Sequence, residues 1–114
     1  MAGLACGEAN TIGWEVLKSY SSAFVSCPDW VSANGMRILG NPLKDDKKVI
    51  SGESGAVTTG LLYEIMTNPD YKELKEDLKL DETSKVLLFS TEGDTDPAMY
   101  RKIVWKGVNS KEEL

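Results

Sequence analysis

The run Val86-Leu87-Leu88-Phe89, preceded by Lys85 and followed by the polar loop 90–96, decides the fold class of this sequence. Its apolar residues do not alternate with polar ones, which is typical of a central parallel strand that helices cover on both faces. A shorter apolar run, Ala23-Phe24-Val25-Ser26, ends at Cys27-Pro28 and is expected to form a second strand. The sequence therefore predicts an α/β fold with few parallel strands flanked by helices.

Helices are expected on both sides of these strands, because capping residues and prolines precede stretches with apolar residues at helical spacing. The expected helices cover 11–20 behind Asn10, 28–40 up to Asn41-Pro42, about 56–67, a charged stretch from Pro69, and a last one from Asp96-Pro97. Two strands do not make a self-sufficient parallel sheet. The chain is therefore expected to be part of something larger or to complete its sheet as a homo-oligomer, through apolar residues near Lys85 and the helix 56–67.

Length and composition bound the classes of function. The 114 residues form one domain at most, and 13 Lys and Arg against 18 Asp and Glu give a net charge of −5. With a pI of about 4.7 the chain lacks the basic patch that nucleic-acid binding needs. The absence of histidine excludes Ser-His-Asp and Cys-His catalysis within this chain.

Membrane, targeting and metal signals are also missing from the sequence. No apolar stretch approaches the roughly 20 residues that a membrane-spanning helix needs. No targeting peptide is visible after Met1, so a cytoplasmic location is expected. Two cysteines, Cys6 and Cys27, are too few for a four-thiolate zinc site, and a disulfide between them is not expected.

Three loops that contain glycine could hold a ligand. They cover residues 3–10, 51–56 and 90–96, and each of them leads into an expected helix. Open α/β sheets bind ligands at the carboxyl ends of their strands, and helix N-termini there bind anions. Taken singly, each loop is explained better by ordinary turn and capping chemistry than by ligand binding.

A set of motifs gains meaning when the motifs are taken together and in order. They are Met1-Ala2-Gly3-Leu4-Ala5-Cys6-Gly7-Glu8, Asn10-Thr11-Ile12-Gly13-Trp14-Glu15, Gly35-Met36-Arg37, Leu39-Gly40-Asn41-Pro42, Ile50-Ser51-Gly52-Glu53-Ser54-Gly55-Ala56-Val57 and Ser90-Thr91-Glu92-Gly93-Asp94-Thr95-Asp96. This set resembles the C-terminal part of the diaminopropionate ammonia-lyase family, which are pyridoxal-phosphate (PLP) enzymes of the tryptophan synthase beta type. One departure is Ala9, where the family string usually has proline.

The resemblance implies roles for several residues at the cofactor. Ser90 is similar to the family serine whose hydroxyl faces the pyridine nitrogen of PLP, with Thr91 as its neighbour or substitute. Glu53 is expected near the ring edge, and its alternative role is to cap the following helix. Gly3 and Gly7 are expected to bind the cofactor from the first loop. The backbone from Ala5 to Glu8 resembles a loop whose carbonyls hold a monovalent cation in some relatives.

The same resemblance implies that residues 1–114 are one C-terminal portion of a fold-type II PLP enzyme, a partial three-layer fragment. The family eliminates ammonia from 2,3-diaminopropionate, a small amino-acid substrate, and yields pyruvate. Its cofactor-bearing lysine and its phosphate loop lie upstream of the matched region, so this chain by itself is expected to be inactive. The alternative is a non-catalytic oligomerisation or docking module derived from that enzyme.

Overall fold

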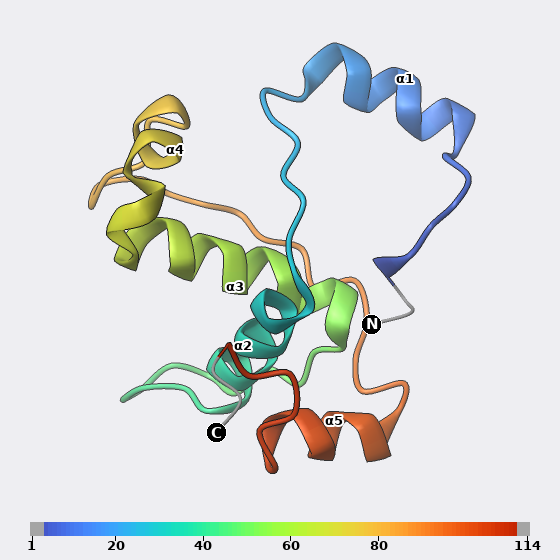
Figure 1. Ribbon diagram of the computed structural model, residues 1–114, viewed down its shortest axis with the longest axis vertical. Coiled ribbons are helices and arrows are strands. Elements are labelled where there is room, and N and C mark those ends of the chain that lie inside the picture. The colour runs from blue at the N-terminus through green and yellow to red at the C-terminus, as the bar shows by residue number, and fades with distance from the viewer. Residues whose placement is uncertain (1–3, 112–114) are drawn as a thin grey trace.

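A computed structural model describes residues 4–111 of the chain, and among these residues it contains helices and no strand. Two central helices cross each other, α5 packs below them, and α1 stands apart at the opposite end of the molecule (Figure 1). The helices are α1 (Thr11–Tyr20), α2 (Asp29–Gly40), α3 (Glu53–Thr67), the 3-10 turn η2 (Pro69–Tyr71), α4 (Lys72–Asp77) and α5 (Pro97–Val104).

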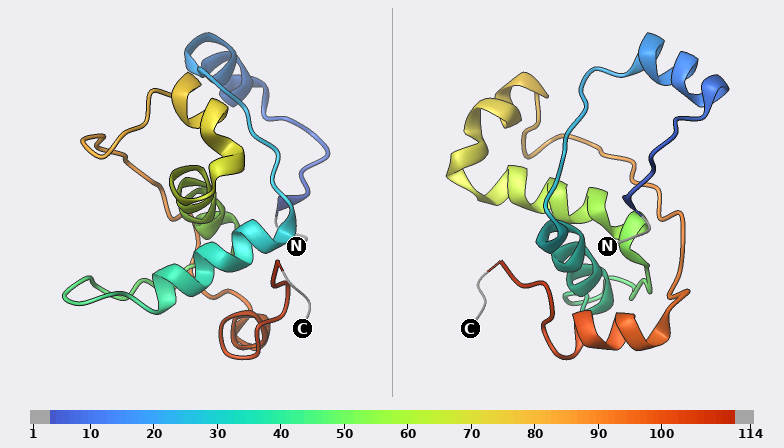
Figure 2. Two further views of the ribbon diagram at one scale, coloured as in Figure 1. Left: turned by 60° about the vertical axis from the view of Figure 1, so that its left-hand side comes forward. Right: turned by 45° about the vertical axis from the view of Figure 1, so that its right-hand side comes forward.

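The crossing of α2 and α3 is a contact between backbones, which Figure 2 shows from two further sides. A Cβ atom added to Gly35 in α2 would collide with the carbonyl oxygen of Ala56 in α3. A Cβ atom added to Gly60 in α3 would collide with the carbonyl oxygen of Val31 in α2. Only glycine therefore permits this approach at the two positions, because every other side chain begins with a Cβ.

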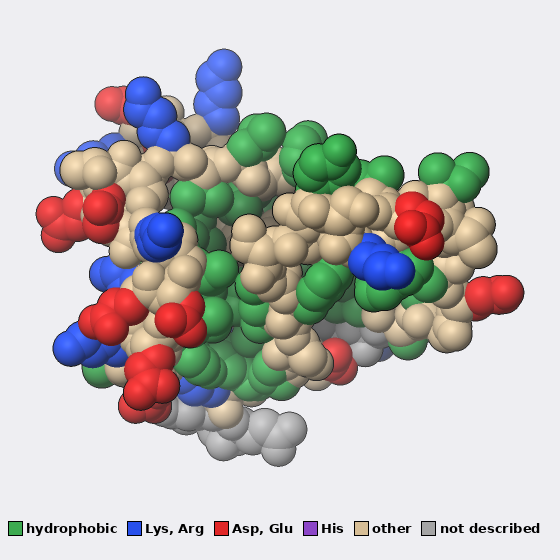
Figure 3. Space-filling view, turned by 90° about the horizontal axis from the view of Figure 1, so that it is seen from above, with side chains coloured by type: hydrophobic (Ala, Val, Ile, Leu, Met, Phe, Trp, Pro, Cys, Tyr) green, Lys and Arg blue, Asp and Glu red, His purple; other side chains and the backbone are tan. Residues whose placement is uncertain are grey.

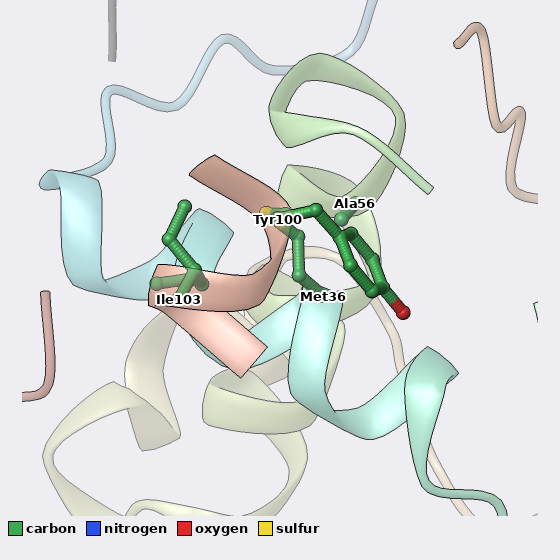
Figure 4. Close-up of a cluster of buried hydrophobic side chains, with 5 residues drawn as sticks. Met36, Ala56, Tyr100 and Ile103 are labelled. Atoms are coloured by element: carbon green, nitrogen blue, oxygen red, sulfur yellow. The ribbon is translucent and has the colours of Figure 1, made fainter. Parts of the chain in front are cut away.

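The hydrophobic core lies where α2, α3 and α5 meet. Met36 and Ala33 from α2, Ala56 from α3, and Tyr100 and Ile103 from α5 form one buried cluster (Figure 4). The hydroxyl of Tyr100 is buried here and has no hydrogen-bond partner in the described part of the chain. This cluster holds α5, and with it the end of the loop 90–96, against the two central helices.

Two cationic side chains, Arg37 and Lys111, connect the segment after α5 to α2 and α3. Arg37 of α2 donates from Nε to the carbonyl of Ile103 at 3.1 Å and from Nη2 to the carbonyl of Val108 at 2.6 Å. Lys111 lies 3.4 Å from the buried carboxylate of Glu64 and 4.6 Å from the ring centre of Trp30. These contacts bring the end of the described chain back to the central helices.

Helix α1 forms as predicted but buries none of its residues. The Asn10 side chain caps it by accepting a hydrogen bond from the backbone N–H of Gly13 at 2.8 Å. Within residues 4–111, α1 makes no contact with another helix, and Ile12 on its apolar stripe is 79% exposed. The helix is thus specified locally, while its apolar stripe packs against no other helix in the described part of the chain.

The predicted strands at 23–26 and 86–89 are not confirmed. Both segments are irregular, and the prediction that Val86–Phe89 is buried on two faces is wrong for this chain. Val86, Leu87 and Phe89 are 45%, 76% and 70% exposed. A strand is defined by ladder hydrogen bonds to a neighbour, and residues 4–111 supply no neighbouring strand.

The predicted helices after residue 50 need smaller corrections. Helix α3 begins at Glu53 rather than near Ala56, because Gly52 already adopts the extended N-cap conformation. The stretch from Pro69 begins as the 3-10 turn η2 before α4 forms. The cap predicted at Asp96 is confirmed, since its carboxylate accepts a hydrogen bond from the backbone N–H of Met99 at 3.0 Å.

Candidate functional site

Two of the three candidate loops meet at the beginning of α3. Residues 51–55 and 90–93 lie side by side there, and five hydrogen bonds join them. Ser90 Oγ donates to Ser51 Oγ at 3.0 Å, and the backbone N–H of Gly52 donates to the carbonyl of Glu92 at 3.0 Å. The site therefore combines segments about 40 positions apart in the sequence.

Two glycines make this approach of the loops possible. A Cβ atom on Gly55 would lie 2.5 Å from Ser51 Oγ and 2.9 Å from Ser90 Oγ. A Cβ atom on Gly52 would lie 2.5 Å from the carbonyl oxygen of Gly93. Bare backbone thus lies beside the two serine hydroxyls, of which Ser51 is fully buried and Ser90 is exposed.

Glu92 supplies the N-terminal cap that α3 otherwise lacks. Gly52 has no side chain to cap the helix, and Glu92 Oε1 accepts hydrogen bonds from the backbone N–H of Ser54 at 3.0 Å and from its hydroxyl at 2.5 Å. These bonds lower the pKa of Glu92 below its ordinary value. A negative charge is also favoured at this position by the partial positive charge of a helix N-terminus.

Glu53 lies in the first turn of α3. A hydrogen bond holds its backbone in place, and its side chain lines the cleft described below. Ser32 of α2 donates its hydroxyl to the Glu53 carbonyl at 2.6 Å. Partial burial raises the pKa of the Glu53 carboxyl, and the nearby Glu92 carboxylate raises it further. The capping hydrogen bonds to α3 come from Glu92, so the proposed alternative role of Glu53 as a hydrogen-bonding cap is not what the structure shows.

The cleft beside this junction has a volume of about 340 Å³. Its acidic lining residues are Glu53, Glu92, Asp94 and Asp96, and Met36, Met99 and Tyr100 form its apolar part. No lysine or arginine is among the lining residues, so the cleft carries negative charge only. Such a lining disfavours the phosphate of a cofactor. The hydroxyls of Ser51 and Ser90 lie at Gly55 and are not part of this lining.

The structure brings some predicted site residues together and leaves others apart. Ser90 and the backbone of Thr91 lie at Gly55, and Glu53 begins the same helix. Gly7 is exposed, and a Cβ atom added there would meet no other atom within 4 Å, so it does not join the cluster. Gly3 lies outside the described residues.

Sequence reasoning missed the roles of Ser51, Ser54 and Glu92. All three lie inside the motifs that were singled out, but their partners are 38 to 41 positions away. The sequence carries no signal that pairs residues at such distances. The only signal that a cap would come from elsewhere is the glycine before α3, because Gly52 at the N-cap position has no side chain to accept a hydrogen bond.

Metal and membrane features are absent from the described residues. No group of three or more His, Cys, Asp or Glu residues that could hold a metal ion is found within 4–111. In the same range, no helix combines the length and the apolar character needed to cross a membrane. Cys6 is exposed and Cys27 is half-buried, and both are free thiols.

The comparison with curated proteins points to one enzyme. Diaminopropionate ammonia-lyase of Escherichia coli K12 is 52% identical to this chain over 107 residues, and that of Salmonella typhimurium LT2 is 52% identical over 108 residues. In both cases the match covers 94% of this chain, and the chain spans only 27% of the relative's length. No protein-family model matches the chain.

Solved structures give the same result in three dimensions. Diaminopropionate ammonia-lyase from E. coli, in complex with an aminoacrylate-PLP azomethine reaction intermediate, superimposes with a TM-score of 0.90 at 51% identity. That match covers 96% of this chain and 29% of the solved one. The selenomethionine holo form of the E. coli enzyme gives a TM-score of 0.92 at 50% identity, covering 99% of this chain and 29% of the solved one. These neighbours are consistent with the expected fragment of a fold-type II enzyme.

Proposed function

We propose that this chain forms one wall of the PLP site of an enzyme like diaminopropionate ammonia-lyase. The chain matches that enzyme as a C-terminal segment. The complete enzyme would eliminate ammonia from 2,3-diaminopropionate and yield pyruvate. The observation that carries the proposal is the pair of hydroxyls, Ser90 and Ser51, held at the bare backbone of Gly55. The chain spans about a quarter of its relatives' length, so the remaining parts of the site lie elsewhere.

The exposed hydroxyl of Ser90 is a donor that fits the nitrogen of a pyridine ring. A Cβ on Gly55 would clash with both hydroxyls, so glycine at this position allows Ser51 and Ser90 to pack directly against the backbone of α3. The Ser90 hydroxyl is exposed, and its proton can rotate from Ser51 Oγ to another acceptor such as a ring nitrogen. We assign the contact with the ring nitrogen to Ser90. Thr91 is placed beside this contact, and Glu53 is placed at the edge of the ring.

PLP, when bound, supplies an electron sink for the carbanion formed at the substrate's α carbon. The Ser90 hydroxyl would influence how strong that sink is. A hydroxyl is a much weaker acid than a carboxyl group and donates a hydrogen bond to the ring nitrogen without transferring its proton fully. This arrangement suits β-elimination better than transamination.

Replacing Ser90 by alanine tests this assignment in a complete enzyme. The suitable protein is the E. coli ammonia-lyase with its matching segment exchanged for this chain. Loss of one hydrogen bond of about 0.5–1.5 kcal/mol should lower turnover roughly twofold to tenfold and shift the absorption of the bound cofactor.

The matched control for Ser90→Ala is Ser84→Ala, since Ser84 bonds only within its own turn at Asp81. Turnover and the cofactor spectrum should both be unchanged in the control. Unfolding in urea should differ little between the two variants. A Ser90→Ala enzyme with the parental spectrum and turnover would exclude Ser90 from the site.

The chain by itself should neither release ammonia from diaminopropionate nor bind PLP covalently. The described cleft is lined by no lysine, and the family's cofactor-bearing lysine lies upstream of the matched region. The measurement is borohydride reduction after incubation with PLP, followed by intact mass. A single stoichiometric pyridoxyl adduct on one lysine would contradict the expectation.

We also propose that the free chain associates with itself, which is the basis of the alternative role as an oligomerisation or docking module. Leu87 and Phe89 are mostly exposed, as are apolar residues of α1. Figure 3 shows hydrophobic side chains gathered on one face beside the charged end of the molecule. Exposed apolar surface of this kind favours burial by association.

Sedimentation equilibrium over a wide concentration range should detect a dimer or higher oligomer. Leu87→Lys should weaken the association if the segment that begins at Lys85 forms the interface. Leu43→Lys in the loop after α2 is the matched control, because Leu43 and Leu87 are exposed to similar extents, 77% and 76%. A stable monodisperse monomer of the unmodified chain would refute self-association.

The cytoplasmic location expected from the sequence stays a prediction.

A further inference from the structure

Glu92 is attached to the beginning of α3 at two points. Its side chain accepts two hydrogen bonds from Ser54, and its main-chain carbonyl accepts one from the N–H of Gly52. The second point is reinforced by the Ser51 hydroxyl, which lies 3.4 Å from the same carbonyl. Together these bonds tie the loop that contains Ser90 to the helix that begins at Glu53.

The position of the Ser90 hydroxyl depends on this attachment. Residues 84–94 belong to no helix or strand, so no regular backbone pattern holds Ser90 in place. Its own side chain makes one bond of good length, to Ser51 Oγ at 3.0 Å, and lies 3.5 Å from the Glu92 carbonyl. Removal of the Glu92 side chain would leave this loop attached to α3 only through the main-chain carbonyl of residue 92 and the Ser90 hydroxyl itself.

We infer that Glu92 is a positioning residue that holds the Ser90 hydroxyl at Gly55 for the contact with the cofactor ring. The inference rests on the function proposed above for Ser90. Glu92 acts in it through its bonds to Ser54 and Gly52 and makes no contact with the reacting atoms. A carboxylate suits this place because one oxygen accepts from a backbone N–H and from a hydroxyl of the same residue.

The structural part of the inference is tested on the chain itself by amide hydrogen exchange. Glu92→Ala should increase exchange at the N–H of Ser54 by tenfold or more, because this group loses its acceptor. Exchange at the N–H of Gly52 should also rise, because its bond to the main-chain carbonyl of residue 92 weakens when the side chain no longer holds the loop at α3. Asp96→Ala is the matched control, since it removes the cap of α5 instead. Unchanged exchange at Ser54 and Gly52 in Glu92→Ala would overturn the inference.

The functional part is tested by a double-mutant cycle in the E. coli enzyme that carries this segment. Glu92→Ala should shift the cofactor absorption in the same direction as Ser90→Ala and lower turnover by at most the same factor. In the Ser90→Ala background, Glu92→Ala should change neither quantity further, because a positioning residue has no effect once the group it positions is gone. Glu92→Gln retains an acceptor oxygen for Ser54 and should restore most of the parental spectrum.

The outcomes separate the inference from the proposed function. If Ser90→Ala changes the spectrum but Glu92→Ala does not, or if the two changes are additive, only the inference is overturned. If Ser90→Ala itself changes nothing, the proposed function of Ser90 fails. Where Glu92→Ala does not fold, a parental spectrum with Glu92→Gln supports the inference, and a Gln variant that is as defective as Ser90→Ala overturns it.

Discussion

Replacing Gly60 by alanine should destabilise the chain by about 3 kcal/mol, the upper part of the range for overpacking in a tight interior. The added methyl group would overlap the carbonyl oxygen of Val31 and lie 3.0 Å from the backbone nitrogen of Gly35. Both obstacles are backbone atoms, so no side chain can rotate away and α2 must move as a whole. The movement would also disturb the core around Met36.

Urea unfolding followed by far-ultraviolet circular dichroism measures this loss. Alanine is the better helix former by about 1 kcal/mol, so propensity alone would make Gly60→Ala stabilising. The control is Gly13→Ala in α1, where the nearest atom to the new Cβ would be Asn10 Oδ1 at 3.4 Å. The control should be neutral or slightly stabilising. A Gly60→Ala chain as stable as the control would show that α2 and α3 do not cross as described.

Replacing Ile103 by alanine should cost about 2–5 kcal/mol, the range for truncating a buried aliphatic side chain. Ile103 is fully buried between α5 and the central helices, and the truncation leaves a cavity among Met36, Ala33 and Tyr100. The helix backbone should persist, because Arg37 still bonds to the Ile103 carbonyl. The result is a less stable core with unchanged topology.

The same denaturation experiment checks Ile103→Ala against Ile12→Ala. Ile12 is 79% exposed, so its truncation should change the free energy of unfolding by less than about 0.5 kcal/mol. The two variants lose the same atoms and differ only in burial. Equal effects would mean that α5 is not packed in the core.

Local signals in the sequence predicted most helices correctly. Asn10 and Asp96 cap α1 and α5 as expected, because a cap acts on a backbone N–H only three positions further on. Gly40-Asn41-Pro42 ends α2 for an equally local reason, since proline cannot continue a helix. These features need no knowledge of the rest of the chain.

The candidate site was predicted in part. The loops 51–56 and 90–96 were recognised from their glycines and motifs, and the structure joins them through Ser51, Ser90 and Glu92. The first loop was assigned to the same site, yet Gly7 makes no contact there. Composition identified loops able to approach a ligand, whereas only the path of the chain determined which of them meet.

The sequence by itself determined the helices, their caps and the apolar stripes, since these depend on residues within a few positions of one another. Only the tertiary structure decided which stripes are buried. Val86–Phe89 and α1 are both apolar, yet they are largely exposed here, while α2, α3 and α5 enclose the core. The physical reason is that burial and strand pairing both require a second part of the chain to pack against the apolar segment. A local sequence pattern does not show whether the chain brings such a part to that segment.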